Sequence, residues 1–304
     1  MPPAPSSARK DVLCLGIAAQ DYVFALDVMP REATKYRAHG FACVGGGIAA
    51  TAAVAVARLG GSARLLTRLG DDAIGDAIIA ELEGYGVDCA LTPRFRGCVS
   101  SLSAVIVDEA GERMIVNYLD PKIPETAGGL PPIPGSVAVV LADTRWIAGA
   151  IAILNAARKK NIIALLDGDM PGAPRELLEA ANMIAFSAEG LAGAAGVSGH
   201  EAGLRKAAEV SDALMMVTDG ARGVSWIEHG TLRHVPAFEV EAVDTLGAGD
   251  VFHGALALAL AEGQAVARAV LFASAAAAIK VTRFGGRAGA PRRAEVEEFL
   301  SQRA

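Results

Sequence analysis

The chain has 304 residues, of which 52% are hydrophobic and 20% charged, so it can build a substantial core and is not globally disordered. Its net charge of −6 argues against a nucleic-acid-binding protein, which usually carries a basic excess. Cys14, Cys43, Cys89 and Cys98 lie far apart, which excludes zinc-binding spacing and a secreted disulfide framework. Residues 1–10 are expected to form a disordered tail and not a signal peptide. The longest apolar runs are shorter than the ~18 residues that span a bilayer, so we expect a soluble cytoplasmic protein.

Short apolar runs alternate with longer amphipathic stretches along most of the chain. The pattern predicts strands at 12–16, 64–67, 137–141, 162–166, 183–186 and 214–218, and helices at 48–59, 73–83, 249–261, 265–282 and 294–301. Each strand is followed by a helix-like stretch, and this alternation predicts an α/β fold with a parallel sheet covered by helices on both faces.

Two stretches depart from that alternation. Residues 22–44 combine β-prone and turn residues without a helical period, and 100–118 alternate like a hairpin with its turn at 108–111. Strands without an intervening helix do not easily join a parallel sheet. We therefore expect a small separate β-sheet, built from about 22–44 and 98–119, that acts as a lid and excludes water from a bound ligand. Its exposed edges predict a homodimer formed by paired lids.

The segment 244–250, Asp-Thr-Leu-Gly-Ala-Gly-Asp, leads directly into the apolar stretch 251–260. Gly247 and Gly249 lie where a helix would begin, and they let a ligand approach the backbone. A helix start aims free N–H groups at an anion such as phosphate. A carboxylate there is repelled by phosphate, so Asp250 makes sense as the base that takes a proton from an attacking hydroxyl. The segment predicts phosphoryl transfer from a nucleotide to an alcohol.

Four motifs resemble those of the ribokinase-like (PfkB) family of carbohydrate kinases, and they follow one another in the same order as in that family. Residues 244–254 match its C-terminal signature, 45–60 resemble its N-terminal signature, 70–75 resemble its Gly-Asp-Asp-x-x-Gly stretch, and 217–223 resemble its Val-Thr-x-Gly-x-x-Gly stretch. The resemblance implies one kinase domain over 11–304, a three-layer α/β sandwich with a mostly parallel sheet and a small β-lid. It implies a sugar and ATP as ligands, with Mg²⁺ as cofactor and no nucleic-acid or membrane partner, and it admits a monovalent cation such as K⁺.

The resemblance also assigns roles to single residues. Asp250 would be the general base, beside an anion hole of backbone N–H groups, and a carboxylate near the first strand would accept sugar hydroxyls. Carboxylates at the end of a strand would order waters around Mg²⁺. The remaining assigned residues are Gly247, Ala248 and Gly249 for the anion hole, Asp21, Gly46 and Gly47 for the sugar, Thr218, Gly220, Gly223, Asp244 and Thr245 for the nucleotide, and Asp167 and Asp169 for the metal. Asp244 and Thr245 could instead shape the loop, and Asp167 and Asp169 could instead cap loops.

Within the family, the chain resembles the kinases of 6-deoxy-6-sulfofructose, which phosphorylate O1 of that sugar. The shared stretches are 45–53, 141–146, 166–169 and 282–289. Lys35, Asn117 and Arg145 fall where those kinases hold the sulfonate, and two cations with an amide donor suit an anionic sugar tail. Fructose 6-phosphate or tagatose 6-phosphate would be held by the same groups, and a neutral ketose is a further alternative. A non-catalytic sugar or nucleotide sensor is the alternative from another class.

The chain departs from the family pattern in two places. The family's Asn-x-x-Glu motif is replaced by Ser-Ala-Glu-Gly at 187–190, where Glu189 lies one place short. The asparagines common after the N-terminal diglycine are Ile48 and Thr51 here. Loss of those amides removes polar contacts to sugar hydroxyls and argues against ribose or adenosine as substrate.

Overall fold

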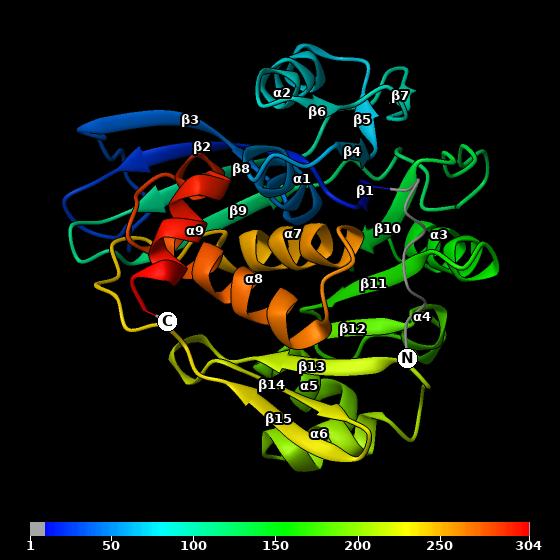
Figure 1. Ribbon diagram of the computed structural model, residues 1–304. Helices are drawn as coiled ribbons and strands as arrows, with labels where there is room; N and C mark the ends of the chain where they lie inside the picture. Colours follow the sequence, from blue (N-terminus) through cyan, green and yellow to red (C-terminus); the bar gives the residue numbers. More distant parts are fainter. Residues whose placement is uncertain (1–9, 304) are drawn as a thin grey trace.

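Short apolar runs form the centre of a nine-stranded sheet in the computed structural model, which describes residues 10–303 (Figure 1). Its parallel strands are β1 (Asp11–Leu15), β4 (Ala63–Leu66), β6 (Val87–Asp88), β10 (Val137–Ala142), β11 (Ile163–Gly168), β12 (Met183–Ser187) and β13 (Leu214–Thr218). Every residue of β10 and β11 is buried, as expected for parallel strands covered on both faces.

Helices cover both faces of this sheet and make the three-layer sandwich that the sequence predicts. One core packs under α1 (Ile48–Arg58), α2 (Ala73–Gly84), α7 (Ala248–Ala261), α8 (Val266–Val281) and α9 (Arg293–Ser301), and the other packs under α3 (Ile147–Lys159), α4 (Arg175–Ala180), α5 (Ala188–Ala195) and α6 (His200–Ala207). Strand β1 serves both cores, because Val12 and Cys14 point into the first and Leu13 and Leu15 into the second.

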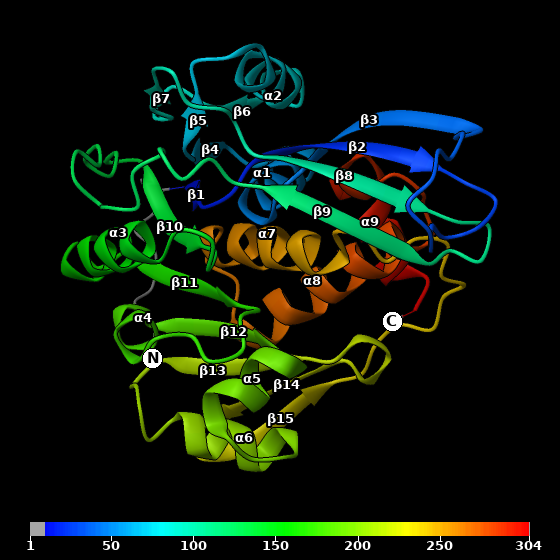
Figure 2. The ribbon, with the colours of Figure 1, turned by 180° about the vertical axis from the view of Figure 1, so that it is seen from behind.

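A second, four-stranded sheet stands apart from the first (Figure 2). It consists, in spatial order, of β3 (Gly40–Gly46), β2 (Ala19–Ala25), β8 (Leu102–Val107) and β9 (Arg113–Tyr118). Strands β8 and β9 form the hairpin expected at 100–118. The small separate sheet is therefore confirmed, although it begins at Ala19 and so includes residues just before the expected range. We call it the lid sheet. A two-stranded sheet of β5 (Leu69–Gly70) and β7 (Arg94–Phe95) completes the fold.

The prediction of a helix after β13 is wrong. A single 3₁₀ turn, η1 (Gly220–Arg222), follows instead, and then the antiparallel hairpin of β14 (Val224–Glu228) and β15 (Thr231–Val235) extends the main sheet. The two-residue connection, His229 and Gly230, has φ values of 50° and 78°. Such a left-handed pair is the turn that matches the twist of a tight hairpin.

The remaining expectations concern the ends and surface of the chain. The tail expected at 1–10 falls outside the described residues, apart from exposed Lys10. No helix within residues 10–303 is long and apolar enough to cross a membrane. All four cysteines are free thiols, and only Cys43 is exposed.

Candidate active site

The start of helix α7 forms an open loop of backbone donors. Gly247 has φ of 75°, a left-handed conformation that glycine adopts without strain. The N–H groups of Gly247 and Gly249 donate no hydrogen bond within residues 10–303, whereas the Ala248 N–H donates to the Thr245 carbonyl oxygen at 3.2 Å. A side-chain carbon at Gly249 would meet no atom within 4 Å. Two of the three expected anion-hole residues, Gly247 and Gly249, therefore have backbone N–H groups without an acceptor in the described chain.

Asp250 stands in the first turn of α7, half-buried. Its carboxyl makes no hydrogen bond or ion pair with any other residue of the described chain. Burial raises the pKa of Asp250 to about 7, and the neighbouring Asp167 carboxyl adds to the rise. A carboxyl that titrates near neutral pH and has no fixed partner is suited to proton transfer.

A buried carboxylate that we did not expect, Asp143, follows strand β10. It accepts hydrogen bonds from the backbone N–H groups of Ile17 at 2.8 Å, Arg145 at 2.8 Å and Ala49 at 3.2 Å. Burial raises its pKa to about 6. A side-chain carbon at Gly16 would lie 2.0 Å from this carboxylate, so the first loop of the chain folds directly around it. Asp143 follows the carboxyl end of a predicted strand, as Asp167 does, and this position could have identified it as a candidate site residue from the sequence.

Asp167 pairs with His253 beneath the Asp250 turn. The His253 Nδ1 atom lies 3.1 Å from Asp167 Oδ2 and 2.7 Å from the Gly249 carbonyl oxygen, and its Nε2 atom lies 3.1 Å from the Ala185 carbonyl oxygen. Both side chains are almost fully buried, and burial raises the pKa of Asp167 well above its usual value. The imidazole thus connects the first turn of α7 to strands β11 and β12.

Asp169 is engaged by its neighbours across the sheet edge. It accepts a hydrogen bond from Thr144 Oγ1 at 2.6 Å and forms an ion pair with the Arg145 guanidinium. Nowhere in residues 10–303 do three or more His, Cys, Asp or Glu side chains group so as to hold a metal ion. The aspartates therefore do not fit a metal site made by protein ligands alone.

A polar row crosses the lid sheet. Asp21 on β2 lies opposite Ser103 on β8, which lies opposite Asn117 on β9. The Asn117 Nδ2 atom donates to Ser103 Oγ at 3.2 Å. Burial raises the pKa of Asp21, while a hydrogen bond with Ser103 opposes that rise. Opposed residues share one face of a sheet, so an amide donor and a carboxyl acceptor are held together there.

Two expected sugar-site glycines are required by the packing of the protein itself. A side-chain carbon at Gly46 would lie 2.3 Å from Asp21 Oδ2, and one at Gly47 would lie 2.4 Å from the Ile17 carbonyl oxygen. Lys35 lies on the exposed connection between β2 and β3. No hydrogen bond or ion pair of the described chain joins Lys35 to Asn117 or Arg145.

A cavity of about 530 Å³ opens beside the anion loop. Its volume and mainly apolar walls suit a small-molecule ligand. Ser274 contributes to the wall, and its buried hydroxyl has no hydrogen-bond partner in the protein. The expected nucleotide residues that line this cavity are Thr218, Gly220, Gly223 and Thr245, together with Ala248 and Gly249.

Asp244 does not line that cavity, and its carboxylate is buried. It accepts hydrogen bonds from the backbone N–H of Leu246 at 2.9 Å, Gly285 at 3.1 Å and Gly286 at 3.2 Å, and from Arg113 at 2.9 Å. Burial alone would raise the pKa of Asp244, but these donors hold it well below its usual range. These contacts favour the alternative role of Asp244, which is to shape the loop, and its role toward the nucleotide stays a prediction.

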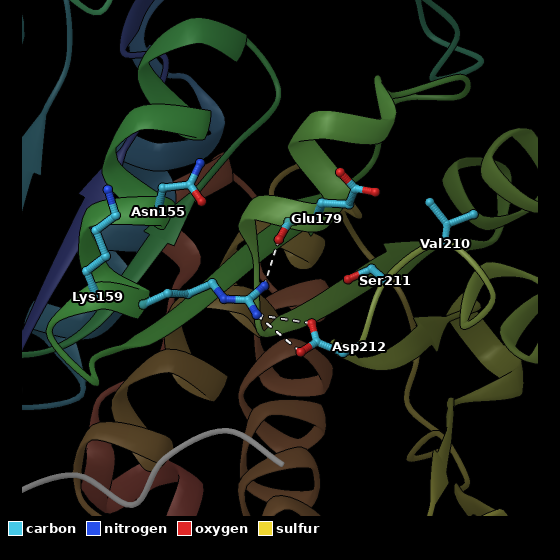
Figure 3. A pocket seen from close by; sticks show the side chains of 7 residues that line it. Asn155, Lys159, Glu179, Val210, Ser211 and Asp212 are labelled. Carbon is cyan, nitrogen blue, oxygen red and sulfur yellow. Dashed lines mark hydrogen bonds and ion pairs between the residues drawn. The ribbon is translucent and has the colours of Figure 1, made fainter.

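A second, more open pocket lies at the other end of the strands, near their amino ends (Figure 3). Its central cation, Arg158, donates to the carbonyl oxygens of Glu179 and Ala181 and pairs with Asp212. Because ligands of open α/β sheets bind at the carboxyl ends of strands, we assign no role in the reaction to this pocket.

The fold and the loop before α7 define a ribokinase-like α/β phosphotransferase. The similarity of the chain to known proteins agrees with this class. Residues 9–293 match the pfkB family of carbohydrate kinases. The ribokinase of Bacillus subtilis is 28% identical over 296 residues, which cover 96% of this chain and 100% of that protein. A crystal structure assigned to a ribokinase of Agrobacterium tumefaciens shares 38% identity and superposes with a TM-score of 0.89 over 97% of this chain and 98% of the other. Rice fructokinase-2 is 27% identical over 303 residues, with 87% of each chain covered.

The chain belongs to the pfkB family of carbohydrate kinases, which transfer a phosphoryl group to a sugar hydroxyl.

Proposed function

We propose that the protein transfers the γ-phosphate of ATP to O1 of an anionic ketohexose such as 6-deoxy-6-sulfofructose, with Asp250 as general base. The main support for phosphoryl transfer is the position of Asp250 in the first turn of α7. Its pKa of about 7 and its lack of a hydrogen-bond partner leave its carboxylate free to accept the hydroxyl proton. The N–H groups of Gly247 and Gly249 would stabilise the charge on the transferred phosphoryl group.

The cavity beside the loop would hold the nucleotide, with its apolar wall against the base and its phosphates at the start of α7. Mg²⁺, carried on those phosphates and on water, would neutralise their charge. Asp167 and Asp169 would contact it through water, since both already have protein partners.

The anionic end of the sugar would lie between the lid sheet and the core. Asn117 supplies an amide on the polar row, Lys35 supplies an exposed ammonium on a lid connection, and Arg145 supplies a guanidinium at the sheet edge. Asp21 would accept sugar hydroxyls on the same row.

The Arg145–Asp169 ion pair favours a second candidate, a neutral ketose. A guanidinium already paired with a carboxylate gives less attraction to an incoming anion. A neutral sugar would leave that pair intact and would need only Asp21 and Asn117.

Initial rates of ADP release separate these candidates. The panel contains 6-deoxy-6-sulfofructose, fructose 6-phosphate, tagatose 6-phosphate, fructose and ribose. We expect the sulfosugar to lead in kcat/KM by about a hundredfold, about 2.7 kcal/mol of transition-state discrimination. Lys35→Ala should reduce that lead and spare fructose. A phosphorylated or neutral sugar in first place would refute the sulfonate assignment and leave the kinase assignment in place.

We also propose a homodimer formed through the lid sheet. On one face its strands expose Phe41 (63%), Val116 (63%) and Phe24 (37%) to solvent, and β3 and β9 are its open edges. Pairing two lids would cover this apolar surface and both edges. A solution mass near 31.1 kDa, the mass of one chain, would contradict the proposal.

A further inference from the structure

Lys280 is an unusual cation, because its side chain is completely buried. It projects from the last turn of α8 toward the segment that leads into the anion loop. An isolated buried ammonium is costly, so its partners indicate why it is retained.

Three oxygen atoms surround the Lys280 ammonium. Its Nζ atom lies 2.7 Å from the Asp244 carbonyl oxygen, 3.3 Å from Asp244 Oδ2 and 3.5 Å from the Arg283 carbonyl oxygen. An ammonium has three N–H donors and no acceptor, so each donor has an oxygen to face. Carbonyl and carboxylate oxygens are also the ligands that replace the hydration shell of a bound K⁺.

This cage supports the phosphate-binding end of the molecule. Asp244 begins the loop that ends at Asp250, and its carboxylate also accepts the N–H groups of Leu246, Gly285 and Gly286. The backbone N–H groups of Val243 and Asp244 both donate to the Val281 carbonyl oxygen, at 2.7 and 3.0 Å. A fixed positive charge among these groups therefore holds the loop in place and lies behind the site where phosphate charge develops.

We infer that Lys280 replaces a dissociable monovalent cation as a positioning residue of the anion loop, so that the kinase requires no K⁺. The space beside Asp244 that such a cation would need is filled by the lysine side chain, whose Cε would be 3.5 Å from a side-chain carbon added at Gly289. The inference depends on the kinase chemistry of the family and not on the identity of the sugar.

The first test uses the unmodified protein. After dialysis into a sodium- and potassium-free buffer, ADP affinity and ADP release with the best sugar of the panel are measured in about 100 mM KCl and in choline chloride of equal ionic strength. We expect both quantities to agree within about twofold. A rise of about tenfold or more in KCl would overturn the inference. The ADP affinity does not require a sugar, so this arm stands even if the proposed substrate is wrong.

The second test compares two substitutions. Lys280→Ala leaves space in the cage, whereas Lys280→Met fills it without a charge. We expect kcat to fall at least about tenfold in both, and KCl or methylammonium chloride to restore kcat and raise Tm only in Lys280→Ala. Lys206→Met, a surface lysine of α6 paired with Glu209, should change neither. Full kcat in Lys280→Met would overturn the positioning role, and if both Lys280 variants fail to fold, the test on the unmodified protein decides.

Discussion

Arg113, on strand β9 of the lid sheet, donates a hydrogen bond from Nη2 to Asp244 Oδ1 at 2.9 Å. This ion pair connects the lid sheet to the segment that leads into the loop before α7, across 131 positions of sequence. Asp244 is almost completely buried, and the guanidinium is one-third exposed. The pair therefore joins the lid sheet directly to the loop that we propose to hold phosphate.

Arg113→Met should uncouple the lid from the loop. A charged hydrogen bond of this kind contributes about 1–3 kcal/mol, reduced here by solvent at the exposed guanidinium. We expect KM for the sugar to rise about five- to tenfold with a smaller change in KM for ATP, measured by steady-state ADP release. Arg96→Met, an exposed arginine, is the matched control. An equal rise in both KM values would show a general loss of structure instead of uncoupling.

The acid limb of the pH profile should report Asp250. Because burial raises the pKa of Asp250 to about 7, the base is protonated and inactive below that pH. We expect kcat/KM of the free enzyme to fall about tenfold per pH unit below pH 7 and to level off above it. A limb with its midpoint near pH 4 would contradict this assignment.

Asp167→Asn should move that limb. The Asp167 carboxyl is the first neighbour that raises the pKa of Asp250, and asparagine keeps a hydrogen-bonding oxygen for His253. Removing the repulsion lowers the pKa of Asp250, so the midpoint should shift about half to one unit toward acid. An unchanged or more alkaline midpoint, read from the same kcat/KM profile, would show that the two carboxyls are not coupled.

Asp250→Asn should stabilise the protein at high pH. The pKa of Asp250 is raised in the folded state, so folding favours the protonated form, and this contribution to stability is lost as the pH rises through about 7. Asparagine resembles the protonated carboxyl at every pH. We expect the variant to unfold at higher urea at pH 8, by about 2–4 kcal/mol, and to match the wild type near pH 4. A wild type that is the more stable protein at pH 8 would contradict the raised pKa of this half-buried, partner-free carboxyl.

The sequence predicts the regular parts of this fold because their signals are local. Strand β13 is found at its expected bounds and α1 within one residue, since apolar runs and flanking glycines mark them. The β14–β15 hairpin was missed because its turn, His229-Gly230, lacks the usual asparagine or aspartate. The alternation of apolar and polar residues in the two strands was also too short to be distinguished from the strand–helix pattern that precedes it.

Site residues could be predicted where they belong to a local sequence motif. They could not be predicted where their position depends on contacts between residues far apart in the chain. The Asp250 loop follows from its residues, because a helix start and a carboxylate are adjacent in sequence. The pairing of Arg145 with Asp169 and the burial of Lys280 against Asp244 depend on strands and helices far apart in the chain. A lysine in an alanine-rich helix is ordinarily a surface residue, and nothing local shows that this one is inside.

The most direct test of the account is single-turnover ADP formation by Asp250→Asn, with Mg²⁺, ATP and the sugar that leads the panel at pH 8. We predict a fall in the rate of about 10²–10⁴-fold, with ADP affinity within about twofold of the wild type because the anion-loop glycines and the cavity are unchanged. A variant that keeps more than about a tenth of the wild-type rate would contradict Asp250 as the base, and with it the proposed mechanism.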